Sequence, residues 1–247
     1  VSPIPIRRIL ETQQGLSYSR NRGLREAAFD LVVYFDDDVR VAPDWIAACL
    51  EAVEKLDADC VVGPVSPAFE CEVPPSISQR VLDSLCSTYS RKGDELMILR
   101  PELAHEVPGC NFAVRKQAAL DAGGFDPLFG CGGKVQRSGD DFEFGRRLNA
   151  HGKRIVYQPR CSIQHLVTSG KFAKPWLRKR WRQDGAFIRS MTPDAPIMRT
   201  RLGRARAVAR IAGMLAYSVL LGLLGRRAAS FEWELKARHT IGYTKGA

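Results

Sequence analysis

The chain has 247 residues, of which 45% are hydrophobic, and this composition is that of a globular protein and excludes a disordered one. Its formal net charge of +10 and its isoelectric point near 9.5 indicate an anionic partner, which could be nucleic acid, a phosphorylated small molecule or an anionic membrane. Seven cysteines without a C-x-x-C spacing favour free thiols in a reducing cytoplasm over a structural zinc site. No secretory signal opens the sequence.

Predicted helices and strands alternate along the first part of the chain, which argues for an α/β sheet. The apolar run Leu31–Phe35 predicts a strand buried on both faces, as in a parallel sheet. We expect helices over residues 17–28, from Pro43 to Leu56, and over 77–89, 116–122 and about 140–150. Strands are expected over 31–35, 60–62, 96–99, 110–114 and 154–157. A loop is expected over 64–75 and a glycine-rich mobile loop over 129–139.

Basic residues dominate the segment 171–210, and the apolar run Ile211–Leu224 follows them. This run is shorter than the ~20 residues needed to span a bilayer. It therefore predicts a helix that lies in the membrane interface or docks on the domain. The sequence thus divides into a domain of residues 1–170 and a basic, amphipathic helical region of residues 171–247.

Three consecutive aspartates, Asp36, Asp37 and Asp38, directly follow the apolar strand. Neighbouring like charges repel one another, and carboxylates beside an apolar core are costly unless a cation compensates them. Ligands bind at the carboxyl ends of strands in open α/β sheets, and carboxylate oxygens suit Mg²⁺ or Mn²⁺. The alternative is a solvated acidic turn.

Two further features have both a chemical and a structural interpretation. Asp140 and Asp141 open a predicted helix, so they could cap it, but capping explains only one of them and the other could be a general base. His165 ends a predicted strand and could bind a metal through its neutral imidazole, or it could be a hydrogen-bonded structural histidine.

Five motifs in order carry a family resemblance: G-L-S-Y-S-R-N-R-G, V-V-Y-F-D-D-D-V, P-G-C-N-F-A-V-R, G-G-F-D and S-G-D-D-F-E-F-G-R-R-L. Over roughly residues 15–167 the chain resembles a family 2 glycosyltransferase. The resemblance implies the GT-A fold, a Rossmann-like α/β domain with a mixed, mostly parallel sheet flanked by helices, here followed by a C-terminal helical appendage.

The resemblance also implies roles for individual residues. Asp38, together with Asp36 and His165, would hold a divalent metal, Mg²⁺ or Mn²⁺, and Asp141 would be the catalytic base. Contacts with the substrates are implied for Arg20, Asp36, Asp37, Gly109, Asn111 and Asp140, the last of which stands where the family has Glu.

The segment L-R-K-R-W, residues 177–181, stands where processive polymer synthases carry Q-x-x-R-W. Arg180 and Trp181 match the last two positions and would bind substrate, whereas Leu177 replaces the glutamine. This departure favours a transferase that adds a single sugar. The alternative interpretation of Arg180 and Trp181 is a basic helix that faces a membrane.

The implied function is metal-assisted, inverting transfer of a sugar from a nucleotide-diphosphate donor to a hydroxyl of a glycan or lipid-linked acceptor, in cell-surface glycan or glycolipid synthesis. We expect the protein to be peripheral, on the cytoplasmic, inner face of an anionic membrane. A nucleic-acid partner is not expected, since few aromatic residues interleave the basic ones. A phosphatase of the haloacid dehalogenase type is excluded because Arg40 stands where it needs Thr or Val.

The resemblance leaves one non-enzymatic alternative open. Family members normally begin with a strand and a helix that carry an aspartate for the base and ribose, and nothing before Gly15 supplies them. Either the chain is a fragment, or it is a catalytically inactive, membrane-associated scaffold.

Overall fold

The computed structural model describes residues 5–85, 93–100, 102, 107–130, 132, 139–192 and 200–245. Within these ranges the helices are α1 (Leu16–Glu26), α2 (Trp45–Leu56), α3 (Gln79–Leu85), α4 (Lys116–Asp121), α5 (Asp140–Ala150), the 3-10 helix η2 (Ser169–Phe172), α6 (Lys174–Met191), α7 (Arg201–Leu223) and α8 (Arg227–Lys245). The strands are β1 (Leu31–Phe35), β2 (Val39–Val41), β3 (Cys60–Val62), β4 (Val65–Phe69), β5 (Met97–Ile98), β6 (Asn111–Arg115), β7 (Ile155–Tyr157) and β8 (Ile163–Val167).

A five-stranded sheet with the order β1-β6-β3-β7-β5 forms the centre of the α/β part. The prediction of a mixed sheet flanked by helices is confirmed, but parallel pairing within this sheet is confined to β3 and β7. The expectation of a mostly parallel sheet is therefore wrong for the described strands. The apolar runs of β3, β6 and β7 arise because helices cover both faces of the sheet, which the sequence pattern does not distinguish from parallel pairing.

Strand β1 lies at one edge of this sheet, where it pairs with β6 in antiparallel register from Leu31 opposite Arg115 to Phe35 opposite Asn111. Only Val32 of this strand is buried, so the prediction of burial on both faces is wrong. The edge position leaves the remaining side chains partly accessible, and it delivers the chain directly to Asp36.

A second sheet of three strands, with the order β2-β8-β4, stands beside the first. The sequence did not predict β2, and it predicted a loop where β4 forms. Pro67 explains the second miss, because proline is unfavourable inside a sheet but is tolerated at an edge, and β4 is an edge strand of this sheet. β8 places His165 opposite Val39, one residue after Asp38.

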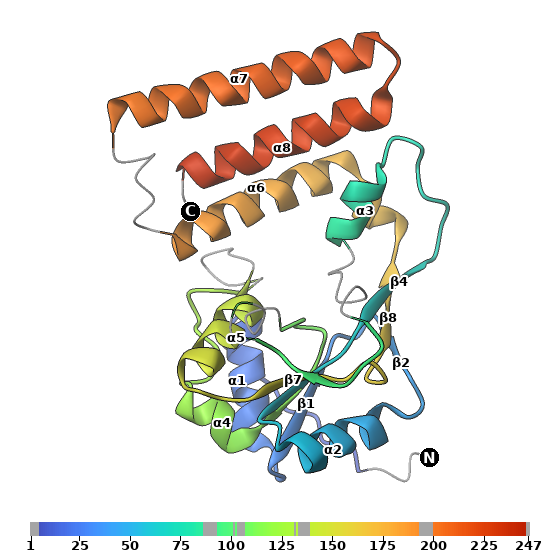
Figure 1. Cartoon of the computed structure of the whole chain (residues 1–247), viewed down its shortest axis with the longest axis vertical. Coiled ribbons are helices and arrows are strands. Elements are labelled where there is room, and N and C mark those ends of the chain that lie inside the picture. Colours follow the sequence, from blue (N-terminus) through green and yellow to red (C-terminus); the bar gives the residue numbers. More distant parts are fainter. Residues whose placement is uncertain are drawn as a thin grey trace.

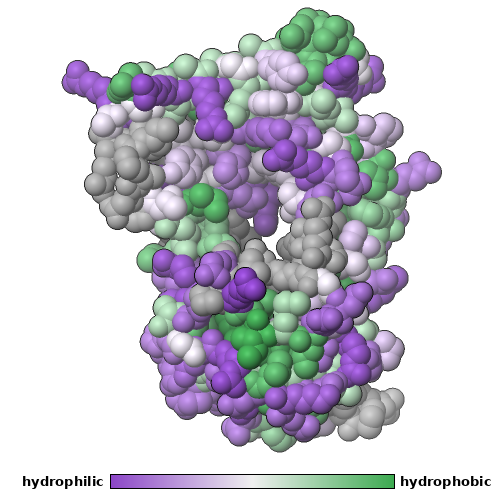
Figure 2. All heavy atoms as spheres, in the orientation of Figure 1, coloured by the Kyte–Doolittle hydropathy of each residue, from purple (hydrophilic) through white to green (hydrophobic). Residues whose placement is uncertain are grey.

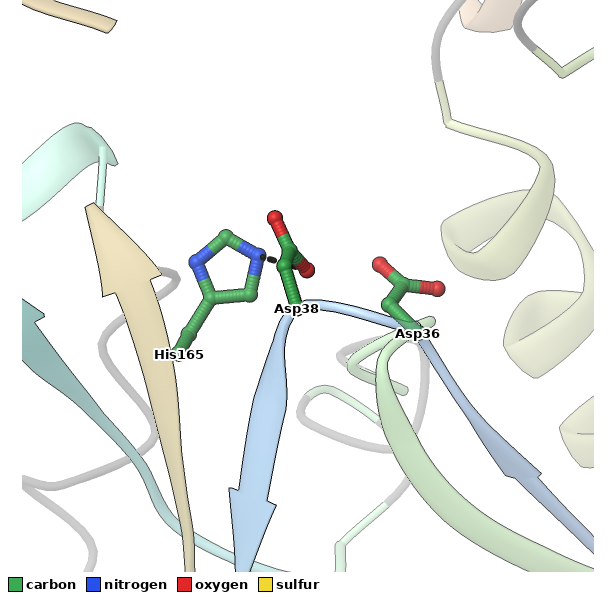
Figure 3. Close-up of side chains that lie close together, drawn as sticks. All are labelled: Asp36, Asp38 and His165. Carbon is green, nitrogen blue, oxygen red and sulfur yellow. Dashed lines mark ion pairs between the residues drawn. The ribbon is translucent and has the colours of Figure 1, made fainter. Parts of the chain in front are cut away.

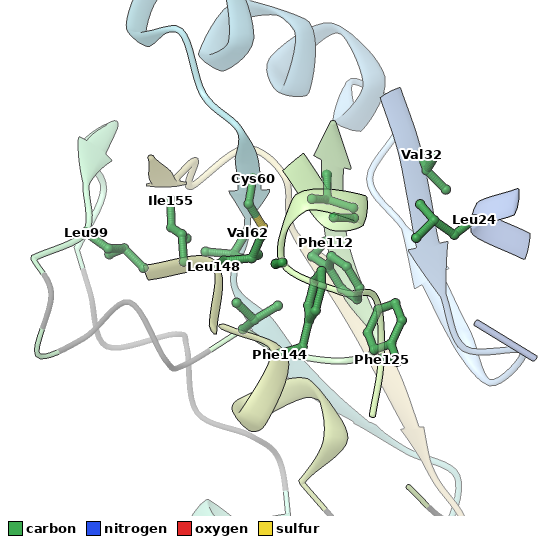
Figure 4. Packing of buried hydrophobic residues seen from close by; sticks show 14 of the residues in the cluster. Leu24, Val32, Cys60, Val62, Leu99, Phe112, Phe125, Phe144, Leu148 and Ile155 are labelled. Atoms are coloured by element: carbon green, nitrogen blue, oxygen red, sulfur yellow. The ribbon is translucent and has the colours of Figure 1, made fainter. Parts of the chain in front are cut away.

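Two apolar clusters lie on opposite faces of the five-stranded sheet. One lies between the sheet and α1, α4 and α5, where Phe112, Phe125 and Phe144 pack together (Figure 4). The other lies beneath α2, whose Trp45, Ala48 and Cys49 are buried. Burial of this kind contributes about 25 cal/mol per Å² of apolar surface removed from water and fixes the position of the strand ends.

The three long C-terminal helices α6, α7 and α8 stack on one another above the sheets (Figure 1). Phe231 and Leu235 of α8 pack with Leu177 of α6, Val81 of α3 and Val167 of β8 in a third apolar cluster. The predicted C-terminal helical region is therefore confirmed. The division into domains at residue 170 stays a prediction.

Helix α7 is long and apolar enough to cross a membrane by length and composition, and only 11% of its apolar window is buried. It extends ten residues before the predicted apolar run, and these residues include four arginines. Its buried residues are Gly203, Ser218 and Leu221, and the Ser218 hydroxyl donates to the carbonyl of Ser230 in α8. At the end of the helix the apolar side chains are exposed, and Figure 2 shows this hydrophobic area at the top of the molecule.

Candidate active site

A cleft of about 300 Å³ opens between the end of β1, the middle of β8, the start of α5 and the face of α6. Of the residues predicted from the sequence, those that line it are Arg20, Asp36, Asp38, Gly109, Asp140, Asp141, His165 and Arg180. The cleft therefore brings together residues from six separate segments of the chain.

Asp36, Asp38 and His165 form one corner of the cleft, and their ligand atoms all lie within 4.8 Å of one another (Figure 3). His165 Nε2 lies 3.2 Å from Asp38 Oδ1. The chain arrives at Asp36 from β1, turns at Asp37, and leaves Asp38 along β2 beside β8. The pleat of β8 directs His165 toward Asp38, so His165 lies in the middle of a strand and not at its end.

The electrostatics of this corner suit a cation. Burial raises the pKa of Asp36, and the nearby Arg20 opposes that effect. Burial alone would raise the pKa of Asp38, but a hydrogen bond from Lys171 and the charges of His165 and Lys171 bring it below its usual value. Burial and Lys171 lower the pKa of His165, which favours the neutral imidazole that binds metals. Two carboxylates and a neutral imidazole fit Mg²⁺ or Mn²⁺.

Arg20 lies at the centre of the cleft wall and is buried, with its side chain only 7% exposed. Its guanidinium forms an ion pair with Asp140, donates to Gly109 O at 2.8 Å and lies 3.9 Å from Asp36 Oδ1. Asp140 is equally buried, and burial raises its pKa while Arg20 opposes the rise. The predicted nucleotide contact of Arg20 thus competes with a structural ion pair.

Asp141 is held by two backbone N–H groups. Its Oδ2 accepts a hydrogen bond from Gly109 N at 2.9 Å and its Oδ1 accepts one from Phe142 N at 2.8 Å. A Cβ atom at Gly109 would lie 2.7 Å from both Asp141 Oδ2 and Arg20 Nη2, so only glycine fits between them. These contacts fix the orientation of the Asp141 carboxylate at the edge of the cleft.

Three predicted site residues do not line the cleft. Asp37 is exposed beside it. Asn111 is fully buried, accepts a hydrogen bond from Trp45 Nε1 and donates to the carbonyls of Pro64 and Cys161. Trp181 packs against the apolar cluster around Leu177 and Phe231. The contacts of Asn111 and Trp181 therefore stabilise the packing of neighbouring elements.

Several residues of the cleft escaped the sequence analysis. Lys171 donates to Asp38 Oδ2 at 3.0 Å, and Trp176 stands one turn before Arg180 on α6. A lysine within a long basic segment carries no signal of its own, so Lys171 could not be singled out. For Trp176, the four-residue spacing to Arg180 was the available signal. The remaining lining residues are Leu16, Val65, Ser84, Leu85, Cys110 and Gly139.

The predicted mobile loop over 129–139 falls mostly on positions 131 and 133–138, which lie outside the described residues. The predicted helix over 77–89 is described to Leu85, where it forms α3.

Comparison with known proteins gives three findings. The family model for glycosyl transferase family 2 matches residues 2–122, so the match begins and ends earlier than the resemblance over roughly residues 15–167. The chain is 24% identical over 169 residues to the glucosyl-dolichyl phosphate glucuronosyltransferase of Haloferax volcanii. That alignment covers 68% of this chain and 52% of the relative, so the chain spans about half of the relative's length.

A solved structure, the crystal structure of GalNAc-T7 with UDP, GalNAc and Mn²⁺, is 16% identical to the chain with a TM-score of 0.44. The superposition covers 72% of this chain and 37% of that one.

Proposed function

Because the chain is a member of glycosyl transferase family 2 by its match over residues 2–122, we propose that it transfers a sugar from a nucleotide-diphosphate donor to an acceptor hydroxyl with inversion. The observation that carries the proposal is the placement of Asp141 and the cluster of Asp36, Asp38 and His165 in one cleft. Inversion requires a base on one face of the sugar and stabilisation of the leaving group on the other.

In this proposal Asp141 is the base. Its carboxylate takes the proton of the acceptor hydroxyl while the acceptor oxygen bonds to the anomeric carbon and the bond from that carbon to the diphosphate breaks. The backbone N–H groups of Gly109 and Phe142 hold the carboxylate in place for this transfer. Asp140 is unsuited to the task because it is buried against Arg20.

Asp36, Asp38 and His165 would hold a divalent cation, Mg²⁺ or Mn²⁺, whose charge would neutralise the leaving diphosphate. Arg20 lines the same cleft and adds positive charge beside Asp36. Arg180 and Trp176 face the cleft from α6, where an aromatic face and a guanidinium suit a sugar ring and a phosphate.

For the acceptor we propose a lipid-linked glycan at a membrane. The family relative from Haloferax volcanii is named for a dolichyl phosphate substrate, which supports a lipid carrier. Exposed Val219, Leu220 and Leu223 of α7, with Arg226 and Arg227 directly beyond them, support binding to an anionic bilayer. With a nucleotide-sugar donor, this placement corresponds to the inner face of the membrane.

The test is calorimetric titration with UDP, GDP and dTDP, each with Mn²⁺ and with EDTA. We expect one nucleotide to bind, more tightly with Mn²⁺. Asp38→Asn should remove the effect of Mn²⁺, whereas Asp37→Asn, the exposed neighbour outside the cleft, should retain it. If none of the three binds under either condition, the chain does not carry a working donor site and the alternative of an inactive scaffold gains support.

A further inference from the structure

Lys171, whose role the proposed mechanism leaves open, places its ammonium group beside Asp38 and His165 of the three-residue cluster. Its Nζ donates to Asp38 Oδ2 at 3.0 Å and to the carbonyl of Leu166 at 3.0 Å, and it lies 3.4 Å from His165 Nε2. The side chain comes from η2, directly after β8, and is 23% exposed. Its charged end therefore lies beside two of the three residues that would hold a cation.

Each carboxylate of the cluster thus has a cation supplied by the chain. Arg20 lies 3.9 Å from Asp36, and Lys171 lies 3.0 Å from Asp38. The two side chains differ in how easily they can leave their carboxylates. Arg20 is held in place because it pairs with buried Asp140 and donates to Gly109 O. Lys171 is partly exposed on a flexible four-carbon stem, and water can replace its contact with the Leu166 carbonyl.

We propose that Lys171 is a displaceable counter-ion that competes with a divalent cation for Asp38 and moves to the donor diphosphate when the donor enters. The proposal rests on the proposed function of the cleft. A cation that takes both Asp38 and His165 as ligands must share their oxygen and nitrogen atoms with this ammonium group or expel it. A donor diphosphate offers the ammonium group a new anionic partner in the same cleft.

This exchange couples the binding of the metal to the binding of the donor. In the free protein the positive charge of Lys171 opposes a divalent cation at a separation of about 4 Å, which is enough for a change of about tenfold in affinity. When the diphosphate draws Lys171 away from Asp38, that opposition ends. The free protein therefore binds metal weakly, and the donor raises the affinity for metal.

The experiment measures Mn²⁺ binding to the free protein by electron paramagnetic resonance of the unbound ion. Lys171→Met should bind Mn²⁺ at least about tenfold more tightly than the parent, because the competing charge is gone. Lys171→Arg, which keeps the charge, should stay close to the parent. Lys174→Met is the matched control, since Lys174 lies over the Phe231 ring outside the cleft and should leave Mn²⁺ affinity unchanged.

A second titration uses pyrophosphate in EDTA as the probe for the diphosphate. The parent and Lys174→Met should bind it equally, and Lys171→Met should bind it about tenfold more weakly. Circular dichroism of each variant checks that the overall helical content is unchanged.

Equal or weaker Mn²⁺ binding by Lys171→Met would overturn the inference and make Lys171 a structural residue of η2. In that case nucleotide binding by the parent would still leave the donor-site proposal standing. Absence of both Mn²⁺ and nucleotide binding in every variant would overturn the two proposals together.

Discussion

The orientation of the Asp141 carboxylate, fixed by the N–H groups of Gly109 and Phe142, is the feature on which transfer should depend most. Asp141→Asn keeps the size of the side chain and one acceptor oxygen but cannot take a proton. We expect it to bind the nucleotide as the parent does and to lose transfer by at least about a hundredfold. Single-turnover transfer and calorimetry measure the two effects separately, and a variant that transferred at nearly the parent rate would remove Asp141 from the role of base.

Arg20 should contribute to stability through its buried pair with Asp140, whose carboxylate is only 6% exposed. Arg20→Ala leaves that carboxylate without its partner, and we expect the free energy of unfolding to fall by about 3 kcal/mol. Urea unfolding measures the change. Arg22→Ala is the matched control in the same helix, since Arg22 pairs with Glu26 at the surface and should cost less than about 1 kcal/mol.

A double variant separates the buried charge from other effects of the substitution. Combining Arg20→Ala with Asp140→Asn removes both charges while the Arg20 substitution stays the same, so part of the lost stability should return. No recovery in the double variant would mean that packing around Arg20, including its contact with the Phe125 ring, causes the loss.

For single residues, the sequence indicated which residue types the cleft contains better than it indicated how their side chains are oriented. The grouping of Asp36 and Asp38 was predictable because carboxylates at a strand end imply a cation, whereas His165 joined them only through the family resemblance. Which side chains turn inward was not predictable, because it depends on backbone directions in the turn after β1. Asp37 is exposed outside the lining of the cleft, and Asn111, whose residue type suits either role, donates to the backbone carbonyls of Pro64 and Cys161.

Among the elements, α6 and α8 run in the same direction and touch through their backbones (Figure 1). A Cβ atom at Gly185 of α6 would lie 1.9 Å from the carbonyl oxygen of His239, and one at Gly242 of α8 would lie 1.9 Å from that of Arg182. Since two helices approach this closely only where a side chain is absent, both glycines are necessary for the contact.

Gly185→Ala and Gly242→Ala should each lower the free energy of unfolding by about 1 to 3 kcal/mol, because the added methyl group must push two backbones apart. Thermal or urea unfolding measures this. Gly213→Ala in α7 is the control, since nothing lies within 4 Å of its Cβ position, and it should be neutral or stabilising by up to about 1 kcal/mol. Equal effects at all three positions would contradict the role of the close contact.

Most helices and strands were predictable from apolar periodicity, and α2, α5 and β3 lie where the sequence places them. β2 has three residues and β4 contains a proline, and such segments lack the alternation that identifies longer strands. Whether neighbouring strands pair in parallel or antiparallel could also not be predicted. An apolar run indicates that both faces of a strand are covered, but it carries no information about the direction of the adjacent strands.

For the whole molecule, the exposed apolar end of α7 makes membrane binding testable. Deleting residues 202–247 would also remove α8, whose Phe231 and Leu235 are buried against Leu177, so point variants are the better test. Val219→Ser with Leu223→Ser should lower binding to anionic vesicles at least about tenfold, because each buried apolar side chain contributes about 1.5 to 3 kcal/mol.

Sedimentation with phosphatidylglycerol vesicles measures the effect. Val41→Ser with Ile46→Ser, two exposed apolar residues near α2, serves as the control and should leave binding unchanged. Undiminished sedimentation of the α7 variant would show that another surface contacts the lipid.

The glycine contact between α6 and α8 has a mechanical consequence. Close-packed protein interiors transmit strain, and at Gly185 and Gly242 the backbones of α6 and α8 are in direct contact with no side chain between them. A tilt of the α7–α8 hairpin would therefore be passed to α6 directly. Helix α6 carries Trp176 and Arg180, which line the cleft. A displacement of α8 at this contact would therefore displace the α6 wall of the cleft with it.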